Sequence, residues 1–374
     1  MRIFTVNMAP VNPPHNDGVK NILVSISEKI KRHDFIFVSS AYAGAFPLRS
    51  NVRYIRSIFE KPGRHSMSVG QIMFVLIAMM FNLPGTDILQ FFITPKRGYT
   101  VFLRAITKLS NKKSIQVVPS VHTLFANNDK VSDDIFFADR VIVQSDYAMS
   151  KLCALGVKNV SRIYPGINTE EYKYRPDCRR AANRRRVIYA GTYKLIDTAY
   201  SLEAFLEIVR GVCVKDPSVE FVMACRLRTK KDIELKETFK RMVLKSDLAD
   251  RFLYLDRVVD MPVVMNTCDI GIMPCKRVMP GVLEIPMALI EGAASGLAVI
   301  YGDVPPLMEL EKKGIGVMLS SSLPSDYSQK IIELLNDACK IEEIREKSGK
   351  AVVEYFDVNK MAEEYGRVYD SLRE

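Results

Sequence analysis

Short apolar segments of strand length alternate with longer amphipathic segments along this chain, and this alternation constrains its fold more than any other feature. After the first such segment, Val19, Ile22 and Ile26 recur at helical spacing. The strands expected in the first half are Arg2–Met8, Phe35–Ser39, Ile88–Phe92, Ile115–Pro119 and Arg140–Val143. Strands that alternate with helices form a parallel sheet with helices on both faces. The sequence therefore predicts an α/β fold.

A second block of the same kind begins near Val187. Its first strand, Val187–Gly191, ends in a glycine, and a helix with an apolar side from Ala199 to Val212 is expected after it. The further strands expected are Glu220–Ala224, Phe252–Leu255, Ile270–Met273 and Ala298–Tyr301. Residues 175–186 contain six arginines and one acid, which is typical of a linker or an exposed loop. Two doubly wound, Rossmann-like lobes predict a working cleft between them, at the carboxyl ends of their strands.

The net charge and the cysteines narrow the surroundings in which the chain works. Lys and Arg outnumber Asp and Glu by 53 to 43, and this excess of +10 favours phosphates, nucleic acid or acidic lipid without choosing among them. Seven cysteines form an odd number without a C-x-x-C pair, which disfavours a disulfide framework or a structural zinc site and favours a reducing compartment. The opening MRIFTVNMAP is too short and too quickly polar for a signal peptide.

One charge-free segment, Ser66–Thr86, raises the question of a membrane. Its continuous apolar run, Ile72–Phe81, is shorter than the roughly 20 apolar residues that a spanning helix needs, so a buried or interfacial helix is predicted. The same lobe has cations at Lys96, Arg97, Arg104, Lys108, Lys112 and Lys113. An apolar face beside such cations would dock a peripheral enzyme on anionic lipid. The alternative is an ordinary helix packed inside the lobe with scattered cations around it.

A glutamate on a mostly apolar helix is the first candidate for chemistry. A helix over residues 286–295 would turn Met287, Ile290 and Ala294 toward the sheet, and Glu291 would share that inward side. A buried carboxylate needs hydrogen-bond donors, which the hydroxyls of a ribose or backbone amides would supply. Amides at the start of the helix would face a diphosphate.

Several runs of the chain resemble one family in their order and spacing. LEIPMALIEGAASGLAVI looks like the signature of retaining GT-B glycosyltransferases, the family 4-like group 1 glycosyl transferases. FFADRVIVQSDYAMSKLCALGVKNVSRIYPGINTEEY resembles the family's passage between the two lobes, and VIYAGTY, VEFVMACR and CDIGIMPC are similar to its next strands. The resemblance implies an acceptor-side lobe over residues 1–175, a nucleotide-sugar lobe over 176–355, and a terminal helix in 356–374 that returns to the first lobe.

The resemblance also implies roles in the second lobe. Glu291 corresponds to the second glutamate of an E-x(7)-E element, which holds the ribose of the nucleotide. The first glutamate would fall at position 283, which is Leu283 here, and Glu284 stands one residue away as its candidate substitute, with Ile285 beside it. Leucine in place of glutamate at position 283 would alter how the donor sugar is recognised.

Two residues of the first lobe correspond to positions that face the donor. His122, in VVPSVHTLF, is similar to the histidine that points at the donor sugar, and its alternative role is that of a core or capping histidine. Gly18, in PPHNDGVKN, corresponds to the loop beside phosphate and acceptor, although the family usually has a glycine pair there. Its alternative role is that of a plain turn glycine.

A leaving diphosphate needs positive charge, because negative charge develops on it as the glycosidic bond breaks. The chain has no Asp-x-Asp element for a metal, so a metal-independent, cationic route without cofactor is expected. The family carries Arg directly after the strand-end glycine, whereas Thr192 follows Gly191 here. Lys194 is the first candidate for this charge and Arg226 the second, the alternative for either being a solvated surface charge.

These observations predict a glycosyltransferase, of the hexosyltransferase class, that moves a sugar from a UDP- or GDP-sugar to an acceptor. Retention is implied by the resemblance alone. The acceptor is expected to be lipid-linked or a glycan, the location cytoplasmic or on the inner face of the membrane, and no nucleic acid partner is expected. Two alternatives stay open: a nucleotide-sugar epimerase on the same fold, or a non-catalytic nucleotide-sugar binder, which Thr192 and Leu283 suggest. A dinucleotide dehydrogenase is disfavoured, because no G-x-G-x-x-G follows either lobe's first strand.

Overall fold

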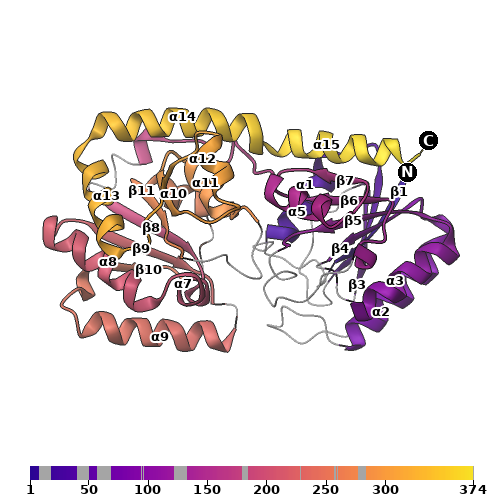
Figure 1. Cartoon of the computed structure of the whole chain (residues 1–374), viewed down its shortest axis with the longest axis horizontal. Coiled ribbons are helices and arrows are strands. Elements are labelled where there is room, and N and C mark those ends of the chain that lie inside the picture. The colour runs from indigo at the N-terminus through magenta and orange to yellow at the C-terminus, as the bar shows by residue number, and fades with distance from the viewer. Residues whose placement is uncertain are drawn as a thin grey trace. The chain divides into compact units, whose positions relative to one another are not determined.

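A computed structural model describes residues 1–7, 18–39, 50–56, 69–93, 95, 97–121, 133–178, 184–227, 229–256, 258, 260–276 and 284–373, the side chains of 69, 97 and 99 excepted. The chain divides into two compact units (Figure 1). Unit 1 comprises Met1–Gly166, Pro280–Glu284 and Val358–Glu374. Unit 2 comprises Ile167–Met279 and Ile285–Asp357.

Unit 1 is built on a parallel sheet with the strand order β3-β2-β1-β4-β5-β6-β7 among the residues described. Its strands are β1 (Arg2–Asn7), β2 (Asp34–Ser39), β3 (Val52–Arg56), β4 (Ile88–Phe92), β5 (Lys113–Val118), β6 (Arg140–Val143) and β7 (Val160–Arg162). Its helices are α1 (Gly18–Lys29), α2 (Val69–Asn82), α3 (Arg97–Ser110), α5 (Asp146–Ala154) and α15 (Val358–Ser371), with 3-10 turns η1 (Leu83–Gly85) and η2 (Asp133–Ile135).

Alternating side chains of the unit 1 strands enter two separate cores. Ile3 of β1 joins α1 and α15 in one cluster, whereas its neighbour Phe4 joins α2 and α3 in another. Successive side chains of a strand point to opposite faces, so α1 and α15 cover one face of the sheet and α2 and α3 the other. A buried hydrogen bond of 2.9 Å from the Tyr369 hydroxyl to Gln90 Oε1 fixes α15 to β4.

Unit 2 is built on a second parallel sheet, with the described strands in the order β10-β9-β8-β11-β12-β13. Its strands are β8 (Arg186–Gly191), β9 (Glu220–Cys225), β10 (Phe252–Tyr254), β11 (Ile270–Met273), β12 (Ala298–Gly302) and β13 (Val317–Leu319). Its helices are α7 (Tyr193–Ala199), α8 (Leu202–Lys215), α9 (Lys230–Leu244), α10 (Met261–Asn266), α11 (Met287–Ala294), α12 (Met308–Lys312), α13 (Pro324–Asn336) and α14 (Ala338–Phe356), with η3 (Ala249–Arg251).

The predicted fold class is confirmed, with two corrections to its elements. The single helix expected after Val187–Gly191 is two helices, α7 and α8, because the Ser201 hydroxyl accepts a hydrogen bond from Ala204 N at 3.0 Å and begins a new helix. The strands β3, β7 and β13 were missed. They are three to five residues long and only half-buried or exposed, so they lack the apolar run that marked the others.

Candidate functional site

The strand order of unit 2 reverses between β8 and β11, which are neighbours in its sheet. Ligands of doubly wound folds bind outside the carboxyl ends of the strands at such a switch point. Gly191 closes β8 at this edge, and Arg226 follows β9. The Arg226 amide donates a 3.0 Å hydrogen bond to the Gly191 carbonyl oxygen, so these two residues of the predicted site lie together.

Thr192, which stands where the family carries Arg, has a structural task. Its hydroxyl accepts a hydrogen bond from Leu195 N at 3.1 Å and caps α7. The Thr192 carbonyl oxygen accepts a hydrogen bond of 3.3 Å from the Tyr189 hydroxyl, whose ring is buried against Phe205. The start of α7 is therefore held to β8 from two sides.

Gly191→Ala should destabilise unit 2, because an alanine Cβ at this position would lie 2.7 Å from the Tyr189 hydroxyl oxygen. Overpacking of this kind costs about 1–3 kcal/mol, and urea unfolding measures it. Gly98→Ala is the matched control, since a Cβ there meets no atom within 4 Å. Equal unfolding midpoints for both variants would contradict the assigned packing.

The candidate cations differ in their exposure. Lys194 is exposed in the first turn of α7, two residues after the cap, and Arg226 is half-buried after β9. Lys276, a further candidate, is exposed after β11, with its ammonium 4.8 Å from the centre of the Tyr200 ring. Arg277 lies outside the described residues. Lys194 and Arg226 thus follow neighbouring strands at one edge of the sheet.

Glu291 lies on α11, but not on the face that was predicted. The residues of α11 that are buried are Leu289, Ile290, Gly292 and Ala293. Met287, Glu291 and Ala294 are half-buried instead, so the predicted inward face of Met287, Ile290 and Ala294 was wrong except for Ile290. The helix is rotated relative to the expectation, because Gly292 allows close approach to Leu297 and Val299.

The Glu291 carboxylate accepts a hydrogen bond from the Tyr172 hydroxyl. Loss of hydration raises the pKa of Glu291 from 4.5 to about 7, while this hydrogen bond and the positive charge of Arg226 act in the opposite direction. The same burial and the negative charge of Glu291 raise the pKa of Tyr172. Glu291, Tyr172 and Arg226 therefore form an electrostatically coupled group in unit 2.

Tyr172 is a member of this group that sequence reasoning missed. It ends the run INTEEY, which entered the family resemblance without a role for its last residue. A single tyrosine among charged residues has no distinguishing pattern, so only the fold brings Tyr172 to the side chain of Glu291 on α11.

Of the two residues predicted in unit 1, the structure describes Gly18, which begins α1 and is half-buried. His122 lies outside the described residues. Val121, the residue before His122, donates its backbone amide to Glu284 Oε1 at 2.5 Å. The Ser145 hydroxyl lies 3.5 Å from Glu284 Oε2 and also caps α5. Glu284, which is 2% exposed, is therefore held by unit 1, beside the chain neighbour of His122.

Ile285, the next residue, is assigned to unit 2 and is fully buried. Its side chain is therefore a packing element of unit 2. That Ile285 contacts substrate remains a prediction. Because its side chain is buried, such a contact would be made by its backbone.

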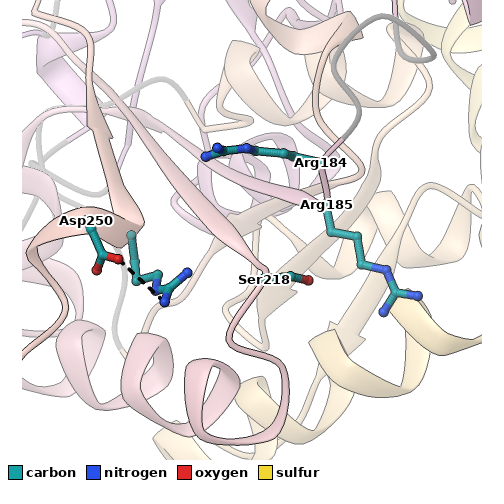
Figure 2. A pocket seen from close by; sticks show the side chains of 5 residues that line it. Arg184, Arg185, Ser218 and Asp250 are labelled. Carbon is teal, nitrogen blue, oxygen red and sulfur yellow. Dashed lines mark ion pairs between the residues drawn. The ribbon is translucent and has the colours of Figure 1, made fainter.

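The opposite, amino-terminal edge of the second sheet carries a basic hollow of about 610 Å³ (Figure 2). Its lining residues are Arg184, Arg185, Ser218, Asp250 and Arg251. Each guanidinium has an acidic partner: Arg184 with Glu220 at 3.4 Å, Arg185 with Asp216 at 3.0 Å, and Arg251 with Asp250 at 3.5 Å. The hollow is therefore largely neutralised, and it lies away from the strand ends where substrates of this fold bind.

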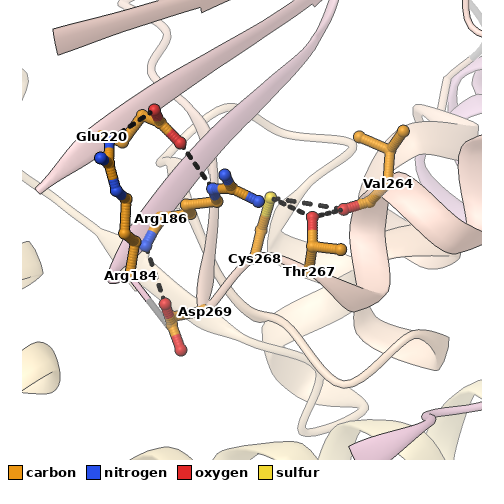
Figure 3. A network of polar contacts seen from close by, with 7 residues as sticks. All are labelled: Arg184, Arg186, Glu220, Val264, Thr267, Cys268 and Asp269. Atoms are coloured by element: carbon orange, nitrogen blue, oxygen red, sulfur yellow. Dashed lines mark hydrogen bonds and ion pairs between the residues drawn. The ribbon is translucent and has the colours of Figure 1, made fainter. Parts of the chain in front are cut away.

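A polar network beside this hollow holds the first strand of unit 2 in place (Figure 3). Arg186 Nε donates to Glu220 Oε2 at 2.6 Å, joining β8 to β9. The Arg186 amide donates to Asp269 Oδ2 at 2.8 Å, joining β8 to the residue before β11. Arg184 and Arg186, two of the six arginines in the predicted linker, thus anchor the start of the second sheet.

Comparisons with known proteins agree with this geometry. Residues 184–337 match the family described as glycosyl transferases group 1, and no curated protein matches the sequence. The whole chain is similar to the sucrose-phosphate synthase of Thermosynechococcus elongatus, with a TM-score of 0.77 and 14% identity, covering 99% of this chain and 98% of that one. It is also similar to the Anabaena HepE protein in complex with UDP and glucose, with a TM-score of 0.74 and 15% identity over 99% of both chains.

A third similar structure is a glycosyltransferase from Rickettsia africae, with a TM-score of 0.71 and 14% identity over 100% of this chain and 98% of that one. At these identities the similar structures establish the fold alone. The link to glycosyl transferases comes from the match of residues 184–337. The resemblance to group 1 glycosyl transferases is confirmed over residues 184–337, and the predicted two-lobed GT-B fold is confirmed for the chain as a whole, whereas retention remains a prediction.

Proposed function

We propose that this protein transfers a sugar from a nucleoside diphosphate sugar, with UDP-glucose as the first donor to test, to an acceptor hydroxyl. The observation that carries the proposal is the coupled group of Glu291, Tyr172 and Arg226, of which Glu291 and Arg226 lie inside the segment that matches glycosyl transferases. UDP-glucose is the first donor to test because the similar protein HepE has been crystallised with it. GDP-sugars are the next donors to test.

In the proposed mechanism, the Glu291 carboxylate accepts hydrogen bonds from the ribose hydroxyls. Lys194 and Arg226 face the diphosphate, where negative charge grows as the bond from the sugar to the phosphate oxygen breaks. Gly191 lets the chain approach this group without a side chain, and Thr192 holds α7 in place. Glu284 and the backbone of Ile285 are proposed on the sugar side, with Glu284 acting through its bond to the Val121 amide.

The remaining steps follow from the same proposal. His122 and Gly18 act on the sugar and the acceptor from unit 1. The acceptor oxygen bonds to the anomeric carbon on the side from which the phosphate leaves, so the configuration is retained. The departing phosphate oxygen takes the acceptor's proton, which removes the need for a separate base. No metal or cofactor takes part in this scheme.

We further propose that the acceptor is lipid-linked or a glycan, that the enzyme is a hexosyltransferase, and that it works in the cytoplasm. The odd number of cysteines without a C-x-x-C pair supports a reducing compartment. No nucleic acid is part of this proposal.

The unfolding temperature of the purified protein should be measured with UDP-glucose, GDP-mannose or ADP-glucose. Release of nucleoside diphosphate should be assayed with the same donors in separate samples of native protein. A ligand that binds only the folded state raises the unfolding temperature, and the rise grows with the logarithm of its concentration divided by its dissociation constant. We expect one donor to raise the midpoint and to release its diphosphate. A midpoint shift without turnover on any acceptor would favour the non-catalytic binder. Conversion of the donor sugar to its epimer, with the diphosphate intact, would favour the epimerase.

A further inference from the structure

The helix α2 of unit 1 presents an uncharged, apolar surface to solvent. Its 14 residues contain no charged side chain. Val75, Ala78 and Met79 are buried against the sheet, whereas Met80 is 59% exposed and Phe81 is 83% exposed. Ile72, Met73 and Ile77 are also exposed on this helix. One apolar side of α2 thus packs into the core, and none of the residues described covers the other side.

The helix α3 extends this surface. Figure 1 shows α2 and α3 side by side, and Leu103 of α3 shares a core cluster with Val75 and Met79 of α2. Val101, Phe102 and Leu109 point away from that core, and Leu109 is 87% exposed. In the described part of unit 1, the exposed large hydrophobic residues all lie on these two helices. A contiguous apolar patch of this kind marks an interaction surface.

Basic residues lie next to the apolar ones on the same exposed side of α3. Arg104 and Lys108 are exposed and four residues apart, so they form a stripe beside Val101 and Leu109. Residues 88–128 contain six basic and no acidic residues, and neither helix carries an acid. The exposed acids that flank the helices in the described part of the chain are Asp87, Asp133 and Asp134.

The proposal concerns the surface formed by the exposed side chains of α2 and α3, which we call the α2–α3 face. We infer that the α2–α3 face docks on an anionic lipid bilayer, with both helices lying in the interfacial plane. The combination of an apolar stripe with adjacent cations suits acyl chains and anionic headgroups together, whereas a protein partner would need no such pairing. Among the residues described, no helix is both long and apolar enough to cross a membrane, so docking here is peripheral. The inference does not depend on the proposed transferase activity.

Co-sedimentation of the full chain with vesicles tests the inference. Vesicles of phosphatidylcholine alone are compared with vesicles that also contain phosphatidylglycerol, at low and high salt. Each cation near an anionic surface contributes about 1 kcal/mol, or roughly fivefold in affinity. Arg104→Glu with Lys108→Glu should therefore lower binding to anionic vesicles at least tenfold. Met80→Gln with Phe81→Gln should lower it as well, by removing exposed apolar groups that carry no part of the core.

Matched variants separate the α2–α3 face from general effects of charge and hydrophobicity. Lys231→Glu with Lys350→Glu makes the same change in net charge at exposed positions of unit 2. Val214→Gln with Leu244→Gln removes two exposed hydrophobic residues of unit 2. Both control pairs should bind anionic vesicles like the parent protein, and unchanged thermal midpoints would show that all variants fold.

The inference is supported if binding requires anionic lipid, fades with salt and is lost in both α2–α3 variants. Equal binding to neutral and anionic vesicles would overturn it, as would no binding at all. Sedimentation velocity provides a further check: a dimer that Met80→Gln with Phe81→Gln dissociates would assign the face to a second copy of the chain instead.

Discussion

Replacing Lys194 by alanine should lower the turnover number for donor consumption by about 10²–10³, the effect of removing one preorganised group that stabilises developing charge. Affinity for the free nucleoside should stay within about twofold, because that ligand carries no leaving group and its binding does not sample the transition state. Lys194 is exposed and outside the core, so its loss should leave the unfolding midpoint unchanged. Initial rates and calorimetric titration with uridine measure the two effects.

Lys231→Ala is the matched control for this variant, since Lys231 is an exposed lysine near the start of α9 in the same unit. It should turn over the donor like the parent protein. Full activity in the Lys194 variant would show that the charge comes from elsewhere, and Arg226, Lys276 and Arg277 would be the next residues to change.

Glu291→Gln should weaken the binding of UDP-glucose at least tenfold. Hydrogen bonds to a charged group contribute about 1.5–3 kcal/mol, and the amide keeps the shape of the side chain but not its charge. Isothermal calorimetry measures the loss. A second readout separates a binding role from a structural one: the carboxyl has a folded pKa near 7, above its ordinary 4.5, so it holds its proton more tightly in the folded state.

A raised folded pKa means that this group lowers the free energy of unfolding as pH rises from about 4.5 to 7, and that the deficit persists above 7. Without ligand, Glu291→Gln should therefore gain stability relative to the parent protein at pH 8, while losing affinity there. UDP-glucose affinity of the parent should rise as pH increases through 7, and the rise should be absent in Glu291→Gln. UDP-glucose is a better probe than free UDP, because the terminal phosphate of free UDP titrates at about pH 6 and would add a pH dependence of its own. Equal affinity in both proteins at pH 8 would refute the ribose assignment.

The fold was predictable from the sequence wherever packing imposed a local pattern. The strands β4, β6 and β11 were predicted with their observed bounds, because each is a short, mostly apolar segment between longer amphipathic ones. The split between α7 and α8 was not predicted, because one serine hydroxyl decides it. A helical apolar pattern continues across that break and conceals it.

The site was less predictable, since its members come from separate parts of the chain. Glu291 stood out because a carboxylate on an apolar helix is unusual, yet its orientation depends on the close packing of Gly292. Tyr172 precedes Glu291 by more than a hundred residues and had no pattern of its own. Glu284 was expected on the substrate side of the second lobe, but its carboxylate is bound by Val121 and Ser145 of unit 1.

The return of the chain to unit 1 has a consequence for synthesis. The side chains of Met361, Tyr365 and Tyr369 on α15 are part of the same core as β1 and α1, and the Tyr369 bond to Gln90 spans 279 residues. Nascent chains fold from the amino terminus as they emerge. Unit 1 is translated first, but its core stays open until unit 2 has been made and α15 has left the ribosome. A ribosome that stalls within unit 2 therefore displays a first sheet whose face is covered by α1 but not by α15. The part of the molecule that is made first is then the last to bury its apolar side chains completely, and it is exposed to aggregation until synthesis ends.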